Sequence, residues 1–96
     1  MALVDPIRFS SNIRFWNPEE QSGLAVADIP SQHIAAIGGL KQQPVEGRIG
    51  SAPFTSNVML AGSGRLALSM SQAIRAAARV GMGDAIEVEI TGIGRD

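Results

Sequence analysis

The sequence predicts a mainly β domain with two short helices, in which two strand–helix–strand halves form one barrel of about six strands related by an approximate twofold axis. Three observations support this. The 96 residues, 45% of them hydrophobic, are enough for one core but not two. Strand and helix signals alternate in the same order in both halves. A segment at residues 27–34 is echoed at residues 67–74.

The first half is predicted to contain a strand, a second strand and a helix. Residues 7–15 alternate apolar and polar side chains, which is typical of a half-buried strand. A polar loop over 17–23 leads to a short strand over 24–28, and we expect these two strands to form a hairpin. Pro30 favours a helix start, and the helix over 31–37 ends at two glycines.

Three strands, a helix and a last strand follow. The predicted strands cover 45–49, 54–60, 65–70 and 86–90. The alanine-rich helix over 71–80 has Ser71 as its N-cap, and the spacing places Arg75 and Arg79 on one helix face. We expect a single domain over residues 1–96, with an ordered core over about 7–91 and a loose tail over 92–96.

The repeat lies where each half passes from a strand into its helix. Residues 27–34 read Ala-Asp-Ile-Pro-Ser-Gln-His-Ile, and residues 67–74 read Ala-Leu-Ser-Met-Ser-Gln-Ala-Ile. The two segments share four of eight residues when the second is shifted by forty positions. We therefore expect each half to contribute one face of a shared barrel.

Composition limits the function. The chain lacks cysteine, which excludes disulfides, thiolate metal sites and a thiol nucleophile. His33 is the single histidine and has no metal-ligand spacing, so we expect no catalytic residues, no metal and no cofactor. No apolar run approaches the length of a membrane span, and no basic segment precedes an apolar one at the start, so we expect a soluble cytoplasmic protein. The formal net charge of −1 provides no overall field for a polyanion.

Several segments together resemble a known family. They are Val45 to Phe54, Gly64 to Met70, Arg75, Gly83-Asp84 and Glu87 to Ile90. This set resembles the bacterial and archaeal domain of unknown function 1905. The resemblance implies a helix-capped double-split β-barrel, in the same broad class as the swapped-hairpin proteins AbrB and MazE. Ser71 stands where their motif usually has proline, and the arginines are not clustered as in AbrB-like proteins, so DNA binding is not implied by the fold.

The charged residues give specific expectations. Glu87 and Glu89 would form cross-strand ion pairs with Arg8 and Arg14 if the first and last strands are neighbours. Asp84 is expected to hydrogen-bond nearby backbone. The candidate contacts for a ligand or nucleic acid are Arg48, Arg65, Arg75, Arg79 and Trp16. The alternative interpretation is a solvated arginine face and a partly buried tryptophan.

Three functions follow in order of preference. The first is a small non-enzymatic binding or interaction module with an unidentified ligand. The alternative is a nucleic-acid-binding regulator of AbrB-like type, and the third is a small enzyme. Because one chain contains both halves of the barrel, we expect a monomer or a weak homodimer.

Overall fold

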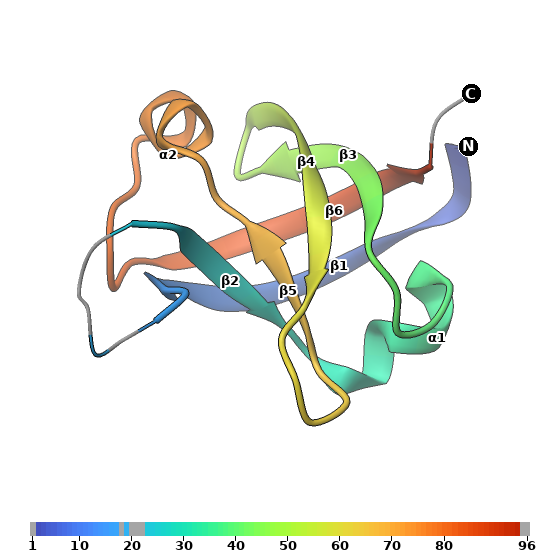
Figure 1. Cartoon of the computed structure of the whole chain (residues 1–96). Helices are drawn as coiled ribbons and strands as arrows, with labels where there is room; N and C mark the ends of the chain where they lie inside the picture. Colours follow the sequence, from blue (N-terminus) through green and yellow to red (C-terminus); the bar gives the residue numbers. More distant parts are fainter. Residues whose placement is uncertain (1, 18, 20–22, 95–96) are drawn as a thin grey trace.

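The computed structural model describes residues 2–17, 19 and 23–94. Its elements follow the predicted order (Figure 1) and are, along the chain, β1 (Ala2–Phe15), β2 (Ala25–Ile29), a 3₁₀ turn (Ser31–His33) continued by α1 (Ile34–Ile37), β3 (Gln43–Ile49), β4 (Ala52–Leu60), β5 (Leu66–Ser69), α2 (Gln72–Ala78) and β6 (Ala85–Ile93).

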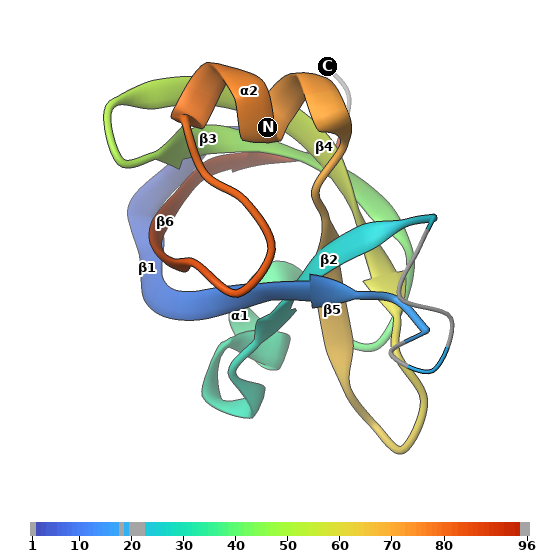
Figure 2. The same ribbon diagram turned by 90° about the vertical axis from the view of Figure 1, so that its left-hand side faces the viewer.

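The strands of the described part form a closed antiparallel barrel in the order β1-β2-β5-β4-β3-β6. This confirms the predicted fold class, including the expected hairpin of β1 and β2. Figures 1 and 2 show α2 and α1 on opposite sides of the barrel. Apolar side chains from all these strands fill the interior together with Ile37 of α1. Among the described residues, no helix is long and apolar enough to cross a membrane.

The two longest pairings explain how the barrel is split. β1 pairs with β6 through residues 7–12 and with β2 through residues 13–15. β4 does the same, pairing with β3 through residues 52–58 and with β5 through residues 58–60. A helical segment packs beside the freed edge of β1, since the ring of His33 lies 5.8 Å from that of Phe9. Because β1 and β4 each change partner along their length, both strands pass from one half of the barrel to the other.

The ladder registers are related by a twofold axis. Ala27 is opposite Leu68 and Arg48 is opposite Glu89, and both pairs are 41 positions apart. Adding 41 to the number of a residue in β2 or β3 gives its equivalent in β5 or β6. Adding 45 to the number of a residue in β1 gives its equivalent in β4. The pair Phe9–Val88, for example, becomes Phe54–Gly47. The same shifts carry the whole β1–β2 register onto that of β4 and β5, so the predicted approximate dyad is present.

The forty-residue alignment of the repeat was wrong by one position. It matched Ala27 with Ala67, whereas the dyad matches Ala27 with Leu68. Side chains alternate between the two faces of a strand, so a slip of one residue exchanges inward for outward positions. The shared Ser-Gln residues at the helix starts produced the wrong alignment.

The dyad also relates two side-chain hydrogen bonds. The Ser11 hydroxyl donates to the carbonyl oxygen of Asp28 at 2.7 Å, and the Ser56 hydroxyl donates to that of Ser69 at 2.6 Å. The surrounding segments are Phe-Ser-Ser-Asn-Ile over 9–13 and Phe-Thr-Ser-Asn-Val over 54–58. Each bond ties a bridging strand to its second partner just where the strand leaves its first, so each half uses the same device to hold its split closed.

Ser11→Ala and Ser56→Ala are expected to destabilise the protein by similar amounts, about 1 kcal/mol each, because each removes one partly buried hydrogen bond. The two sites share no partner, so the double variant should lose the sum. Urea unfolding of the four proteins measures this. A negligible loss at one site alone would show that the two bonds are not equivalent.

Three predicted boundaries were wrong. α2 ends at Ala78, because Arg79 takes a left-handed conformation with φ 58° and closes the helix. The expected tail is also partly ordered, since β6 continues to Ile93 and pairs with β3 there. β1 likewise begins at Ala2 rather than at residue 7. The end of the predicted tail, residues 95 and 96, lies outside the described residues.

Candidate functional site

The outer surface of β1, β6, β3 and β4 consists of two halves related by the dyad. The axis passes between Arg48 and Glu89, so each outward position of β1 and β6 has a counterpart on β4 and β3. We call the two halves the β1/β6 face and the β3/β4 face. Comparing them shows which side chains are used within the fold and which are not.

On the β1/β6 face, polar side chains pair with one another. Arg8 Nε lies 2.7 Å from Glu89 Oε2, and the Ser10 hydroxyl donates to Glu87 Oε1 at 2.6 Å. The ion pair of Arg8 with Glu89 confirms the prediction from the sequence. These contacts join β1 to β6 across the ladder and pair four of the outward side chains of this face.

Arg14 binds a different carboxylate from the one expected. Its Nε and one terminal nitrogen donate to the two carboxylate oxygens of Asp28 at 2.7 and 2.9 Å. Its other terminal nitrogen donates to the carbonyl oxygens of Phe15 and Trp16. The predicted pairing of Arg14 with β6 was wrong because β1 has already moved to β2 at this point.

The ion pair changes the ionisation of both partners. The hydrogen bond from Arg14 holds the pKa of Asp28 below its ordinary value, an effect that burial of the carboxyl partly opposes. The hydrogen bond to Asp28 likewise raises the pKa of Arg14. Both effects favour the charged pair, which is a two-pronged contact of the kind that arginine makes best.

Asp28→Asn is expected to lower the unfolding free energy by roughly 0.5–1 kcal/mol at neutral pH, because the pair is only partly shielded from solvent. A carboxyl with a lowered folded-state pKa stabilises the fold above its unfolded pKa of about 4 and loses that effect as the pH falls through the folded value. Urea unfolding of wild type and variant should therefore differ at pH 7 and converge in acid. An unchanged difference across this range would contradict the assignment.

The β3/β4 face lacks these pairs. The counterparts of Arg8, Ser10 and Glu87 are Pro53, Thr55 and Glu46. Among the described residues, no side-chain partner is found for Glu46, Arg48, Thr55 and Asn57. The carbonyl oxygen of Glu46 accepts a weak bond of 3.5 Å from Thr91, but its carboxylate is unused. This face therefore presents a carboxylate, a guanidinium, a hydroxyl and an amide to solvent.

Among the described side chains, the β3/β4 face also has no counterpart of the Arg14–Asp28 ion pair. Met59 stands where the other half has Arg14, and Ser69 stands where it has Asp28. The site that the ion pair fills in the first half is a depression in the second, with a volume of about 380 Å³ and walls that include Met59, Ser69 and Gln42.

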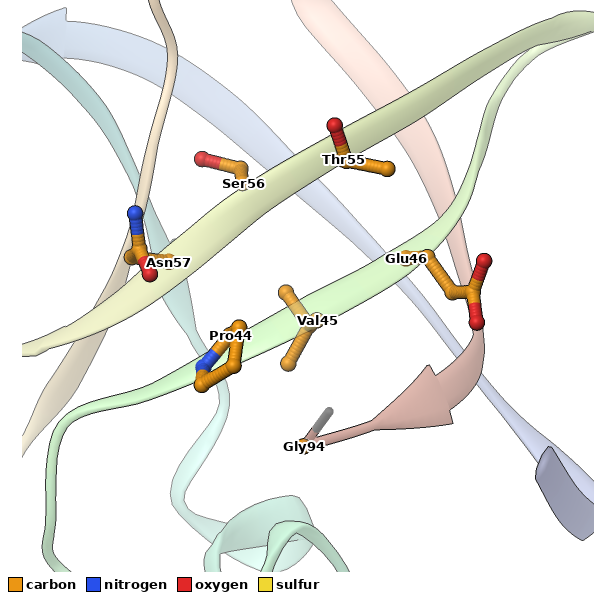
Figure 3. A pocket seen from close by; sticks show the side chains of 7 residues that line it. All are labelled: Pro44, Val45, Glu46, Thr55, Ser56, Asn57 and Gly94. Carbon is orange, nitrogen blue, oxygen red and sulfur yellow. The ribbon is translucent and has the colours of Figure 1, made fainter. Parts of the chain in front are cut away.

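Three depressions join along β3 and β4. The one at Met59 shares Pro44 and Asn57 with a second of about 350 Å³, shown in Figure 3. The second shares Glu46 and Thr55 with a third of about 450 Å³ that reaches Arg48 and Pro53. Figure 3 shows Glu46 turned toward the end of β6. It lies over Gly92, where a β-carbon would come within 2.6 Å of the carboxylate. We call this run of depressions the β3–β4 groove.

Of the residues predicted as contacts, Arg48 lines the groove and the other four lie elsewhere. Arg65 precedes β5 and α2 follows it, so Arg65 lies at the opposite end of that strand from Arg75 and Arg79 (Figure 1). Arg75 Nε donates to the carbonyl oxygen of Met70, and Arg79 is the C-cap residue of α2.

Trp16 is half-buried at the end of the β1–β2 hairpin. Its backbone N–H donates to the carbonyl oxygen of Leu24 at 2.7 Å. Its own carbonyl oxygen accepts from Arg14. The loop it leads into includes positions 18 and 20–22, which lie outside the described residues.

Sequence reasoning missed Glu46, Thr55 and Asn57. The signal that could have revealed two of them is the repeated five-residue segment, in which Thr55 and Asn57 take the places of Ser10 and Asn12. Glu46 lies outside this segment, and only the register of the barrel shows that it takes the place of Glu87. That these side chains find no partner in the described part of the chain depends on their rotamers and neighbours, which no sequence pattern reports.

Other candidate chemistry is structural. Asp84 Oδ2 accepts from the N–H of Gly81 at 2.7 Å, which confirms its predicted bond to nearby backbone. Within the described ranges, no three His, Cys, Asp or Glu side chains are arranged to hold a metal ion. His33 lies against Phe9 in the split of the barrel and does not line the groove.

A comparison with family models identifies the chain. The family described as domain of unknown function (DUF1905) matches residues 9–90, which is most of the sequence. The chain belongs to DUF1905. The match begins at Phe9 in β1 and ends at Ile90 in β6, so the matched region of this chain includes parts of both halves of the barrel. The family description assigns no activity or ligand. No curated protein matches the chain.

Proposed function

We propose that this DUF1905 chain is a non-catalytic binding module whose ligand lies in the β3–β4 groove. The observation that supports it is the contrast between the two dyad-related faces. Arg8, Ser10, Glu87 and Glu89 of the β1/β6 face bind one another. Their counterparts Thr55, Glu46 and Arg48 in the groove find no side-chain partner among the described residues. The β1/β6 face is therefore a reference, within the same molecule, for a surface on which charged and polar side chains bind one another.

The contrast has an energetic meaning. A ligand on the β1/β6 face must first break the bonds of Arg8 and Ser10, and the bonds it makes replace those it destroys. In the groove a ligand displaces only water from Glu46, Arg48 and Thr55. The backbone beneath is held by two ladders, so little conformational freedom is lost on binding.

Two alternatives receive less support. An enzyme would need an acid, base or nucleophile aimed at a common point, and the groove offers one exposed carboxylate and one guanidinium. Turnover in a broad hydrolase and transferase screen that is abolished by Glu46→Gln would overturn the non-catalytic assignment.

An AbrB-like regulator of nucleic acid would need a positive surface. Among the described residues around the dyad, the carboxylates of Glu46, Glu87 and Glu89 outnumber the guanidinium groups of Arg8 and Arg48. Retention of random duplex DNA at low salt, with loss of binding on Arg65→Ala, Arg75→Ala and Arg79→Ala, would favour the regulator instead.

The groove can be tested without knowing the natural ligand. Acetate, guanidinium and N-methylacetamide are titrated at millimolar concentrations into isotope-labelled protein, and amide shifts are followed by NMR. We expect the shifts to gather at Glu46, Arg48, Thr55 and Asn57. Arg8, Ser10 and Glu87 provide the matched reference on the other face. Shifts of equal size on both faces would refute the proposal.

A further inference from the structure

We propose that the groove takes an extended peptide segment with one apolar side chain at one end and a basic and an acidic side chain, two residues apart, at the other. This rests on the proposed function and names its ligand class. The dimensions, the charges and the missing ion pair each contribute to the argument.

The groove has the length of a short strand. On β4 it runs from Met59 to Pro53, which at about 3.3 Å per residue is roughly 20 Å. An extended peptide has the same rise, so a segment of about seven residues lying along β3 and β4 stays in step with their side chains. Small ligands would fill only one of the three joined depressions.

The charged end selects the ligand class. Glu46 and Arg48 occupy successive outward positions of β3, roughly 6.5–7 Å apart along the strand. Side chains on one face of an extended peptide have this same spacing, so a basic residue can reach Glu46 while an acidic one reaches Arg48. The charges of a nucleic acid are all negative phosphates, so Glu46 would repel it while Arg48 attracted it.

The apolar end is where the dyad is broken. In the first half, the Arg14–Asp28 pair covers the outside of β2. In the second, the half-buried Met59 and the short Ser69 leave that space open. Met59 and Pro44 line it with apolar surface, and methionine adapts readily to the shape of a side chain placed against it. We expect an aliphatic residue of the peptide there.

Between the two ends, the groove offers neutral hydrogen-bonding groups. The Thr55 hydroxyl and the Asn57 amide both donate and accept, which suits the alternating N–H and carbonyl groups of a peptide backbone. Counting along β4 from Met59, Glu46 lies level with Thr55 and Arg48 with Pro53. The recognised pattern is therefore an apolar residue, a basic residue four positions on and an acidic residue two further, read in either direction.

Two synthetic peptides test this. One is acetyl-Leu-Thr-Thr-Thr-Lys-Thr-Glu-amide, and the other exchanges only Lys and Glu. We expect the wild type to bind the first about tenfold more tightly by NMR titration. A protein carrying both Glu46→Arg and Arg48→Glu should prefer the second peptide. Equal affinity for the two peptides, or a preference that the double variant does not reverse, would overturn the proposal.

A second variant tests the apolar end. Met59→Arg with Ser69→Asp copies the Arg14–Asp28 pair of the first half into the second, so it should fill the depression and abolish binding of both peptides. Glu87→Gln on the β1/β6 face is the matched control and should bind as wild type does. Persistent binding by the copied-pair variant would contradict the inference.

A failure of the peptide proposal can be told apart from a failure of the proposed groove. If acetate, guanidinium and N-methylacetamide gather in the groove but neither peptide binds at millimolar concentrations, the peptide class is wrong and the groove stands. Concentration-dependent shifts at Glu46 and Arg48 without any peptide would instead identify a second copy of the chain as the occupant.

Discussion

Gly47→Ala is expected to be among the most destabilising single substitutions in the molecule. A β-carbon at this position would lie 1.8 Å from the backbone oxygen of Glu89 and 2.9 Å from the Cα of Ile90. Both atoms belong to the β6 backbone, so no side-chain rotation can relieve the collision and β3 must separate from β6. Overpacking usually costs about 1–3 kcal/mol, and displacing a ladder should exceed this. The total stability of such a domain is about 5–15 kcal/mol.

The measurement is urea unfolding followed by circular dichroism. Gly81→Ala is the matched control, because an added β-carbon there meets nothing closer than 3.9 Å and the position does not have positive φ. We expect a change within about 0.5 kcal/mol for the control. If the two alanine variants unfold at the same urea concentration, β3 and β6 do not approach each other as described.

The second large effect is expected for Leu68→Ala. Leu68 lies opposite Ala27 on one side and Val58 on the other, and it is 0% exposed. Its partner on the dyad is the small Ala27, so the ladder neighbour on that side cannot fill the space. Removing a buried leucine side chain typically costs about 2–5 kcal/mol, and we expect a value in the upper half of that range.

Leu60→Ala provides the comparison, because it makes the same chemical change at a residue that is 46% exposed. We expect a loss below about 1 kcal/mol there, from the smaller apolar area involved. Comparable losses at Leu60 and Leu68 in the same unfolding experiment would show that the interior is not centred on the dyad.

Much of the fold was predictable because alternation reports burial directly. The last strand shows this, since Ile86, Val88 and Ile90 are buried as their alternation indicates. What alternation does not report is where a strand changes partners. The pairing of Arg14 with Asp28 depends on β1 leaving β6 after residue 12, and this is a property of the closed barrel rather than of the segment.

The dyad was predicted, but its register was not. The connection from β1 to β2 spans residues 16–24, whereas that from β4 to β5 spans 61–65. Because the first connection is four residues longer, the shift between equivalent residues changes from 45 to 41 along the chain. A search with one constant shift therefore cannot align the Phe-Ser-Ser-Asn-Ile segment and the following strand at the same time.

The candidate site was the least predictable part. Arg48 was found because arginine attracts attention in a chain with few charges, but so were Arg65 and Arg75, which lie elsewhere. Glu46 and Asn57 are ordinary surface residues in the sequence. Their importance depends on the comparison with Glu87 and Asn12, and that comparison needs the register of the barrel.

The position of Arg48 and Glu89 on the dyad has a consequence for fragments of the chain. If the chain is cut at the β3–β4 turn, a homodimer of the N-terminal fragment can form this barrel only by placing Arg48 opposite a second Arg48. A homodimer of the C-terminal fragment would place Glu89 opposite a second Glu89. Like charges directly across a ladder are destabilising, whereas the intact chain places Arg48 opposite the oppositely charged Glu89. Each fragment should therefore associate with the other in preference to itself, and mixing the two should reconstitute a heterodimer rather than two homodimers.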